Sequence, residues 1–137
     1  MSLSPEQFRK VNQIKTALGK SDRRLKDDFI SIDTFERSAK EAKSGRVMAE
    51  WPQHIAGLQA ETLRARGRLD KLDTGLRAQR RLHDALTELA AAFGAWHRGL
   101  SSNQIDEVDV ALAKMKRHYA NADRLGKAGL ADLKAGR

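Results

Sequence analysis

The four histidines are the side chains of this sequence best suited to bind a metal or to act as a general base. His83 and His97 fall on one expected helical face, but the helix between them would separate them by about 21 Å, too far to share an ion. The sequence contains neither Glu-x-x-His nor His-Glu-x-x-His, and it has no cysteine. We therefore expect no metal site, no cofactor and no catalytic centre. The histidines should lie at the wet edge of a helical core.

A dense run of basic side chains is the second group with candidate chemistry, because such a cluster could bind phosphates or another polyanion. Between residues 64 and 81, seven basic residues stand against two acidic ones, which leaves a local charge of +5. The seven are Arg64, Arg66, Arg68, Lys71, Arg77, Arg80 and Arg81. On a helix they fall on both sides of the apolar seam, as expected when long aliphatic stems cover the edge of a core. Nucleic-acid or polyanion binding is therefore the alternative function and not the favoured one.

Trp96 and Arg98 are candidates for contact with a protein partner, since an exposed tryptophan beside an arginine is a frequent interaction hot spot. Trp96 lies one step off the regular apolar seam. Packing of its indole in the core is the competing and preferred interpretation. In the same seam, Gln79 and His83 form two consecutive polar layers. They either fix the register of the helices or face solvent.

Composition limits the class of protein. The 137 residues are 32% charged and 40% hydrophobic, with only two prolines, as expected of one helix-rich domain. The net charge of +8 is spread along the chain rather than collected in an arm. No stretch approaches the roughly 20 apolar residues of a membrane span. Because no signal peptide is recognisable, we expect a cytoplasmic protein; an extracytoplasmic domain of an anchored protein is the alternative.

The first expected helix spans residues 5–44. Ser4 and Gln7 have the spacing of a capping box, and Pro5 suits the first helical position. The apolar face of its first half is formed by Phe8, Val11, Ile14 and Leu18. Gly19 is a candidate break, but apolar residues seven apart continue across it, which favours one bent helix.

The second expected helix spans residues 52–99 and should organise the fold. From Ile55 to Leu100, seam positions alternate three and four residues apart, a period typical of supercoiled helices. Asp73-Thr74-Gly75 is a break signal within this segment. Since a loop normally shifts the phase of the pattern and no shift is visible, a continuous helix is preferred over one broken near Gly75.

A third expected helix covers residues 102–133, and residues 134–137 are expected to fray because glycines weaken the pattern there. Short links between long helices require antiparallel neighbours. The expected fold is therefore all-α: one domain, residues 4–133, formed by an antiparallel, coiled-coil-like bundle of three helices. A four- or five-helix bundle with breaks near Gly19 and Gly75 is the alternative.

With a long seam and no recognisable chemistry, the favoured function is a non-enzymatic interaction or scaffold module acting through protein–protein contacts. Its partner would be another protein or a second copy of the chain. The sequence does not specify whether a small molecule binds between the helices.

Overall fold

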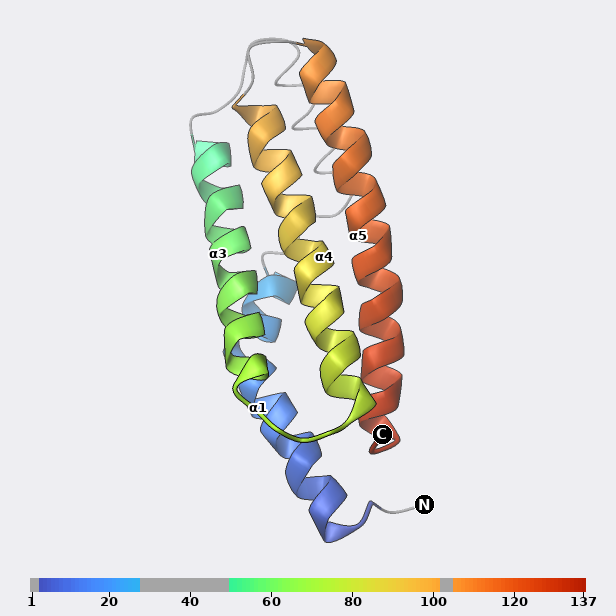
Figure 1. Cartoon of the computed structure of the whole chain (residues 1–137). Helices are drawn as coiled ribbons and strands as arrows, with labels where there is room; N and C mark the ends of the chain where they lie inside the picture. The colour runs from blue at the N-terminus through green and yellow to red at the C-terminus, as the bar shows by residue number, and fades with distance from the viewer. Residues whose placement is uncertain (1–2, 28–49, 102–104) are drawn as a thin grey trace.

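The computed structural model describes residues 3–27, 50–101 and 105–137, and these ranges contain four helices and no strand. The helices are α1 Pro5–Asp27, α3 Glu50–Asp70, α4 Arg77–Leu100 and α5 Ile105–Lys134. α3, α4 and α5 lie side by side in antiparallel order, and α1 crosses one end of them obliquely (Figure 1). The all-α expectation is confirmed, whereas a set of three helices does not describe these ranges. None of the described helices combines the length and the apolar content of a membrane span.

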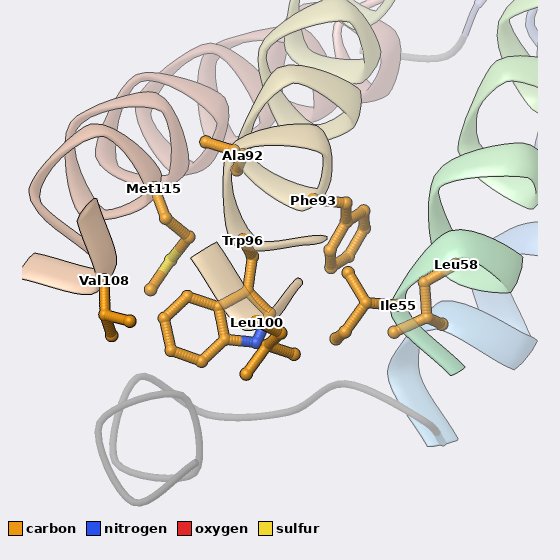
Figure 2. Packing of buried hydrophobic residues seen from close by; sticks show 9 residues of the cluster. Ile55, Leu58, Ala92, Phe93, Trp96, Leu100, Val108 and Met115 are labelled. Atoms are coloured by element: carbon orange, nitrogen blue, oxygen red, sulfur yellow. The ribbon is translucent and has the colours of Figure 1, made fainter. Parts of the chain in front are cut away.

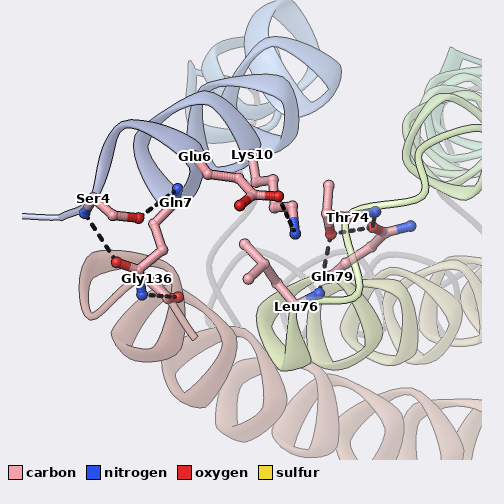
Figure 3. A network of polar contacts seen from close by, with 8 residues as sticks. All are labelled: Ser4, Glu6, Gln7, Lys10, Thr74, Leu76, Gln79 and Gly136. Atoms are coloured by element: carbon pink, nitrogen blue, oxygen red, sulfur yellow. Dashed lines mark hydrogen bonds and ion pairs between the residues drawn. The ribbon is translucent and has the colours of Figure 1, made fainter.

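The start of α1 has the capping hydrogen bonds that the sequence predicts. The backbone N–H of Gln7 donates to Ser4 Oγ at 3.1 Å, and the backbone N–H of Ser4 donates to Gln7 Oε1 at 3.0 Å (Figure 3). This reciprocal pair is the predicted capping box. Gly19 has non-helical dihedral angles, φ 2° and ψ −101°, so α1 is kinked at the expected position. The remainder of the helix expected over 5–44 lies outside the described residues.

The continuous helix expected over 52–99 is wrong, and the alternative break near Gly75 is confirmed. α3 ends at Asp70 and α4 begins at Arg77; between them Gly75 has φ 69°, a left-handed conformation that glycine adopts without a steric penalty. The Gln79 side chain stabilises the connection by donating to the carbonyl oxygens of Leu69 at 3.0 Å and Leu72 at 2.9 Å. Its Oε1 accepts from the Thr74 hydroxyl at 2.6 Å (Figure 3). The Gln79 side chain, which the sequence predicts as a polar layer of the seam, therefore stabilises the loop between α3 and α4.

The predicted seam is confirmed throughout α3 and in part in α4, where Ala90, Phe93 and Leu100 are buried at predicted positions. In α3 every predicted seam position is buried: Ile55, Leu58, Thr62, Ala65 and Leu69. In α4, Ala78 and Leu82 are buried, whereas Gln79 and His83, one residue further along, are half-buried. α4 packs against both α3 and α5, so it buries a wider arc than one seam provides. The departure from the predicted seam is therefore confined to residues near the start of α4, and the wider buried arc of this helix includes later positions that the seam predicted.

Two apolar clusters form the core at opposite ends of the helices. One surrounds Trp96, which is 1% exposed and lies among Ile55, Phe93, Leu100 and Met115 (Figure 2). The second lies where α1 crosses the other helices. Its buried members are Val11, Ile14, Ala17, Leu69, Ala78, Leu82 and Leu133. This second cluster fixes α1 and thereby shapes the surface between α1 and α3.

The α4–α5 interface is closely spaced because small residues recur along it. Ala78, Ala85, Ala92 and Gly99 are seven residues apart and buried on α4. At Gly99 an added Cβ would lie 2.6 Å from the Cβ of Ala111 on α5, and at Gly129 it would lie 2.8 Å from Leu82 Cγ. The absence of side chains at these two glycines is therefore what permits the close approach.

The C-terminal residues, which we expected to fray, make specific contacts. Gly136 has φ 71°, its N–H bonds to the Leu133 carbonyl, and the Arg137 N–H bonds to the Asp132 carbonyl. This pattern is a Schellman motif, which ends α5. The Gly136 carbonyl also accepts from Gln7 Nε2 of α1 at 3.2 Å (Figure 3).

Candidate docking groove between α1 and α3

The predicted basic cluster does not form one surface, because two of its arginines bind a carboxylate of α5. Asp132 is buried and receives Arg77 through Nε at 3.2 Å and Nη2 at 3.0 Å, and Arg81 through Nη1 at 2.7 Å. The hydrogen bond from Arg77 is the main cause that holds the pKa of Asp132 below its usual range; the nearby charges of both arginines act in the same direction. The two arginines thus join the start of α4 to the end of α5.

Three further arginines of the cluster bind the protein itself. Arg64 pairs with Glu61 at 2.7 Å, and Arg66 donates to Thr87 Oγ1 at 3.2 Å. Arg68 Nε donates to the carbonyl oxygen of Ala17 in α1 at 2.9 Å. The other two members, Lys71 and Arg80, are exposed. Five of the seven predicted polyanion ligands therefore have structural partners, which disfavours a shared phosphate site.

Two of the four histidines, His83 and His118, each pair with a single carboxylate on a neighbouring helix. His83 Nδ1 lies 2.6 Å from Asp70 Oδ1, and His118 Nδ1 lies 2.6 Å from Glu88 Oε2. Within the described ranges, no group of three or more histidine and carboxylate side chains is arranged to hold a metal. These pairs link α3 with α4 and α4 with α5.

The structure separates the two residues predicted to contact a partner. Trp96 is buried in the core, so its indole does not reach the surface, and the preferred core interpretation is confirmed (Figure 2). Arg98 is exposed and lines a hollow of about 350 Å³ near the start of α5. Cations and carboxylates line this hollow together: Arg98 on α4, and Lys114, Asp106 and Glu107 on α5.

A larger hollow, of about 710 Å³, runs between α1 and the end of α3. We call it the α1/α3 groove. It is lined by Phe8, Arg9, Asn12, Gln13, Thr16, Ala17, Arg68, Lys71 and Leu72. The α1 residues in this set recur four apart, so they form one continuous face of the helix.

Phe8 is the most unusual side chain of the groove, because 59% of it is exposed. The sequence placed it on the buried face of α1 with Val11 and Ile14. Those two residues are buried, but Phe8 lies roughly 120° from Ile14 around the helix axis and falls at the edge of the core. Its expected burial is therefore wrong. An exposed phenyl ring beside a hollow is a common feature of binding surfaces.

All charged side chains that line the groove are positive. Three of its nine lining residues are cations, and none is acidic. Arg68 is held by its bond to Ala17, whereas neither Arg9 nor Lys71 forms an ion pair with a described residue. The bond from Arg68 joins the end of α3 to α1 two residues before the kink at Gly19. It therefore helps to fix the two walls of the groove.

Sequence reasoning identified Arg68 and Lys71 as exposed basic residues but did not connect them with α1. The missing information was tertiary: Phe8 and Arg9 reach these residues only because α1 packs obliquely against α3 (Figure 1).

Comparison with known proteins gives no assignment: no protein-family model matches the sequence, and no curated protein or solved structure is significantly similar to it. The geometry of the groove is therefore the main support for a function.

Proposed function

We propose that this chain is a non-enzymatic helical bundle that binds another protein through the α1/α3 groove. The observation that carries the proposal is the exposure of Phe8 at a hollow of about 710 Å³. Burying an exposed phenyl ring in a complex removes apolar surface from water, and aromatic residues next to cations are enriched where binding energy concentrates. No requirement of the fold explains the exposure, since Val11 and Ile14 already anchor α1 in the core.

Among the described residues, two groups have a shifted pKa and both lie outside the groove, which favours binding over catalysis as the role of the groove. Burial, followed by the charge of Asp123, raises the pKa of Tyr119, and ion pairing lowers that of Asp132. Neither residue lines the α1/α3 groove. Both shifts have structural causes and supply no acid or base to the groove.

Polyanion binding is a weaker candidate. Of the seven basic residues that suggested it, Arg77 and Arg81 neutralise Asp132, and three others bind groups within the protein. The remaining exposed pair, Lys71 and Arg80, is too small a set to bind a phosphate backbone tightly.

Site-specific photocrosslinking tests the protein-docking role. A photoreactive phenylalanine analogue is placed at position 8 in the full chain, and the control chain carries it at position 130. Leu130 is also exposed but lies on α5, outside the groove. In the cells that make the protein, we expect discrete adducts only from position 8, with peptide mapping that places an identified protein against α1. No adduct at position 8, or equal adducts from both positions, would overturn the proposal.

A further inference from the structure

We infer that the groove receives an acidic amphipathic helix whose apolar stripe packs against Phe8 and whose carboxylates reach Arg9 and Lys71. The inference rests on the proposed docking function and specifies the chemistry of the partner. Shape, polarity and charge each support it.

The shape of the groove suits a single helix. From Phe8 to Ala17, α1 presents nine residue steps, which correspond to about 14 Å of helical wall. The opposite wall is the end of α3 with the first residues of the following loop, Lys71 and Leu72. The α1 wall is long enough for two to three turns of a partner helix laid in the groove, with anchors at positions i, i+3 or i+4, and i+7. The opposite wall is shorter and would contact the partner helix over about one turn.

The polarity of the lining requires a partner with two faces. Phe8, Ala17 and Leu72 supply apolar surface, whereas Asn12 and Thr16 supply polar groups along α1. A uniformly polar segment would leave the phenyl ring of Phe8 in water. A uniformly apolar segment would bury the amide of Asn12 without a hydrogen-bond partner, at a cost in free energy. An amphipathic helix satisfies both parts of the lining.

The charge of the lining residues indicates the charge of the partner helix. Because the lining contains cations and no carboxylate, acidic side chains at the rim of the partner would be attracted by Arg9 and Lys71. The same distribution argues against a second copy of this chain. In a two-fold symmetric contact each groove would meet its own equivalent, so these cations would face cations.

An unbiased selection tests the charge of the partner. A displayed library of helical peptides, with acidic, basic and neutral residues equally represented at the randomised positions, is panned on the full chain. It is then counter-selected on Phe8→Ser, which removes the phenyl ring without adding a charge. Because Phe8 is largely exposed, this variant is expected to keep its fold, which circular dichroism checks. We expect the surviving peptides to be acidic on one face and apolar on the other. Survivors without excess negative charge, or no survivors, would overturn the inference.

Charge reversal gives a second, quantitative readout on the selected peptides. Lys71→Glu and Arg9→Glu should each weaken binding by roughly three- to tenfold in fluorescence anisotropy, because an exposed attractive pair becomes repulsive. A peptide in which one glutamate is replaced by lysine should recover affinity for Lys71→Glu. Leu130→Ala, outside the groove, should leave the affinity unchanged.

The two proposals fail in different ways. If adducts map to position 8 in cells but the selected peptides are neutral, or Lys71→Glu binds them as well as the original chain does, docking stands and the acidic partner is wrong. If the adducts join two copies of this chain, docking stands and the partner is a second copy. If peptides are selected but no cellular adduct forms, the docking function itself is wrong, and the acidic-partner inference falls with it.

Discussion

Single polar side chains determine which basic residues of the surface are available to bind an external ligand. Asp132 is an isolated carboxylate near the end of α5, yet it binds two arginines that the sequence grouped into a polyanion site. Gln79 similarly interrupts an apolar seam, and its side chain donates to the carbonyl oxygens of Leu69 near the end of α3 and of Leu72 in the loop. In both cases the partner lies several turns away or on another helix. Local sequence identified the residue types but not these roles.

Replacing Asp132 with asparagine should destabilise the protein in a pH-dependent way. The pKa of Asp132 lies below its ordinary value because of Arg77 and Arg81, so the ionised carboxylate stabilises the fold. That contribution is complete above the unfolded pKa of about 3.9 and is lost as pH falls through the lower folded pKa. We expect Asp132→Asn to lower the Tm near neutral pH and to lower it less in acid, as measured by circular dichroism.

The exposed Asp84 on α4 provides the control, because it forms no ion pair with any residue that the structure describes. Asp84→Asn should leave the Tm nearly unchanged across the same pH range. An Asp132→Asn deficit that stayed constant into strong acid would contradict the ion-pair explanation.

At the scale of elements, α4 is the helix on which the fold depends. It packs against α3 through one part of its surface and against α5 through another, and small residues bring α5 close. α1 is attached at one end by the apolar cluster around Ile14 and by Arg68. The groove is thus formed by a firmly packed helix, α3, and an oblique one, α1.

Two glycine-to-alanine substitutions distinguish the effect of helix propensity on stability from the effect of close packing. Gly99→Ala places a Cβ 2.6 Å from the Cβ of Ala111, so we expect a loss of about 1–3 kcal/mol in the free energy of unfolding. Gly67→Ala on α3 has nothing within 4 Å and should gain about 0.5–1 kcal/mol from the better helix propensity of alanine. Urea unfolding of both variants measures the difference. Equal effects at the two positions would show that α4 and α5 are not in close contact at Gly99.

At the scale of the whole molecule, the net charge of +8 is distributed over surfaces with different local character. The charged side chains that line the α1/α3 groove are all cations, whereas the hollow beside Arg98 has charged side chains of both signs. Most arginines of the 64–81 segment bind neighbouring groups in the protein. Net charge therefore predicts a general attraction to anions, and the folded arrangement restricts where a specific anion could bind.

Duplex DNA should accordingly bind only weakly and without a defined site. In a gel-shift assay we expect retardation at low salt that disappears at physiological ionic strength, since few phosphates would be contacted. Reversing Lys71 and Arg80 to glutamate should reduce the retardation no more than reversing the exposed pair Arg117 and Arg124 on α5. Retardation that survives physiological salt and is lost only with Lys71 and Arg80 would support the polyanion function instead.

The sequence by itself determined the features that depend on neighbouring residues. Helical class, the capping box at Ser4 and Gln7, the kink at Gly19 and the buried stripe of α3 all follow from spacing and propensity within a few turns. The break at Gly75 also has a local signal in the sequence, although the uninterrupted seam favours a continuous helix. Local chemistry at Asp73-Thr74-Gly75 outweighed that periodicity because a left-handed residue and a bonded glutamine stabilise the turn.

Only the tertiary structure decided which side chains remain available. Whether Arg77 is a ligand for phosphate or a partner of Asp132 depends on the packing of α4 against α5. Whether Phe8 is core or surface depends on the angle at which α1 crosses α3. These outcomes depend on contacts between residues far apart in the chain, and the helical period fixes a face of one helix but not what that face meets. For this reason the candidate groove, unlike the helices that form it, could not be predicted from the sequence.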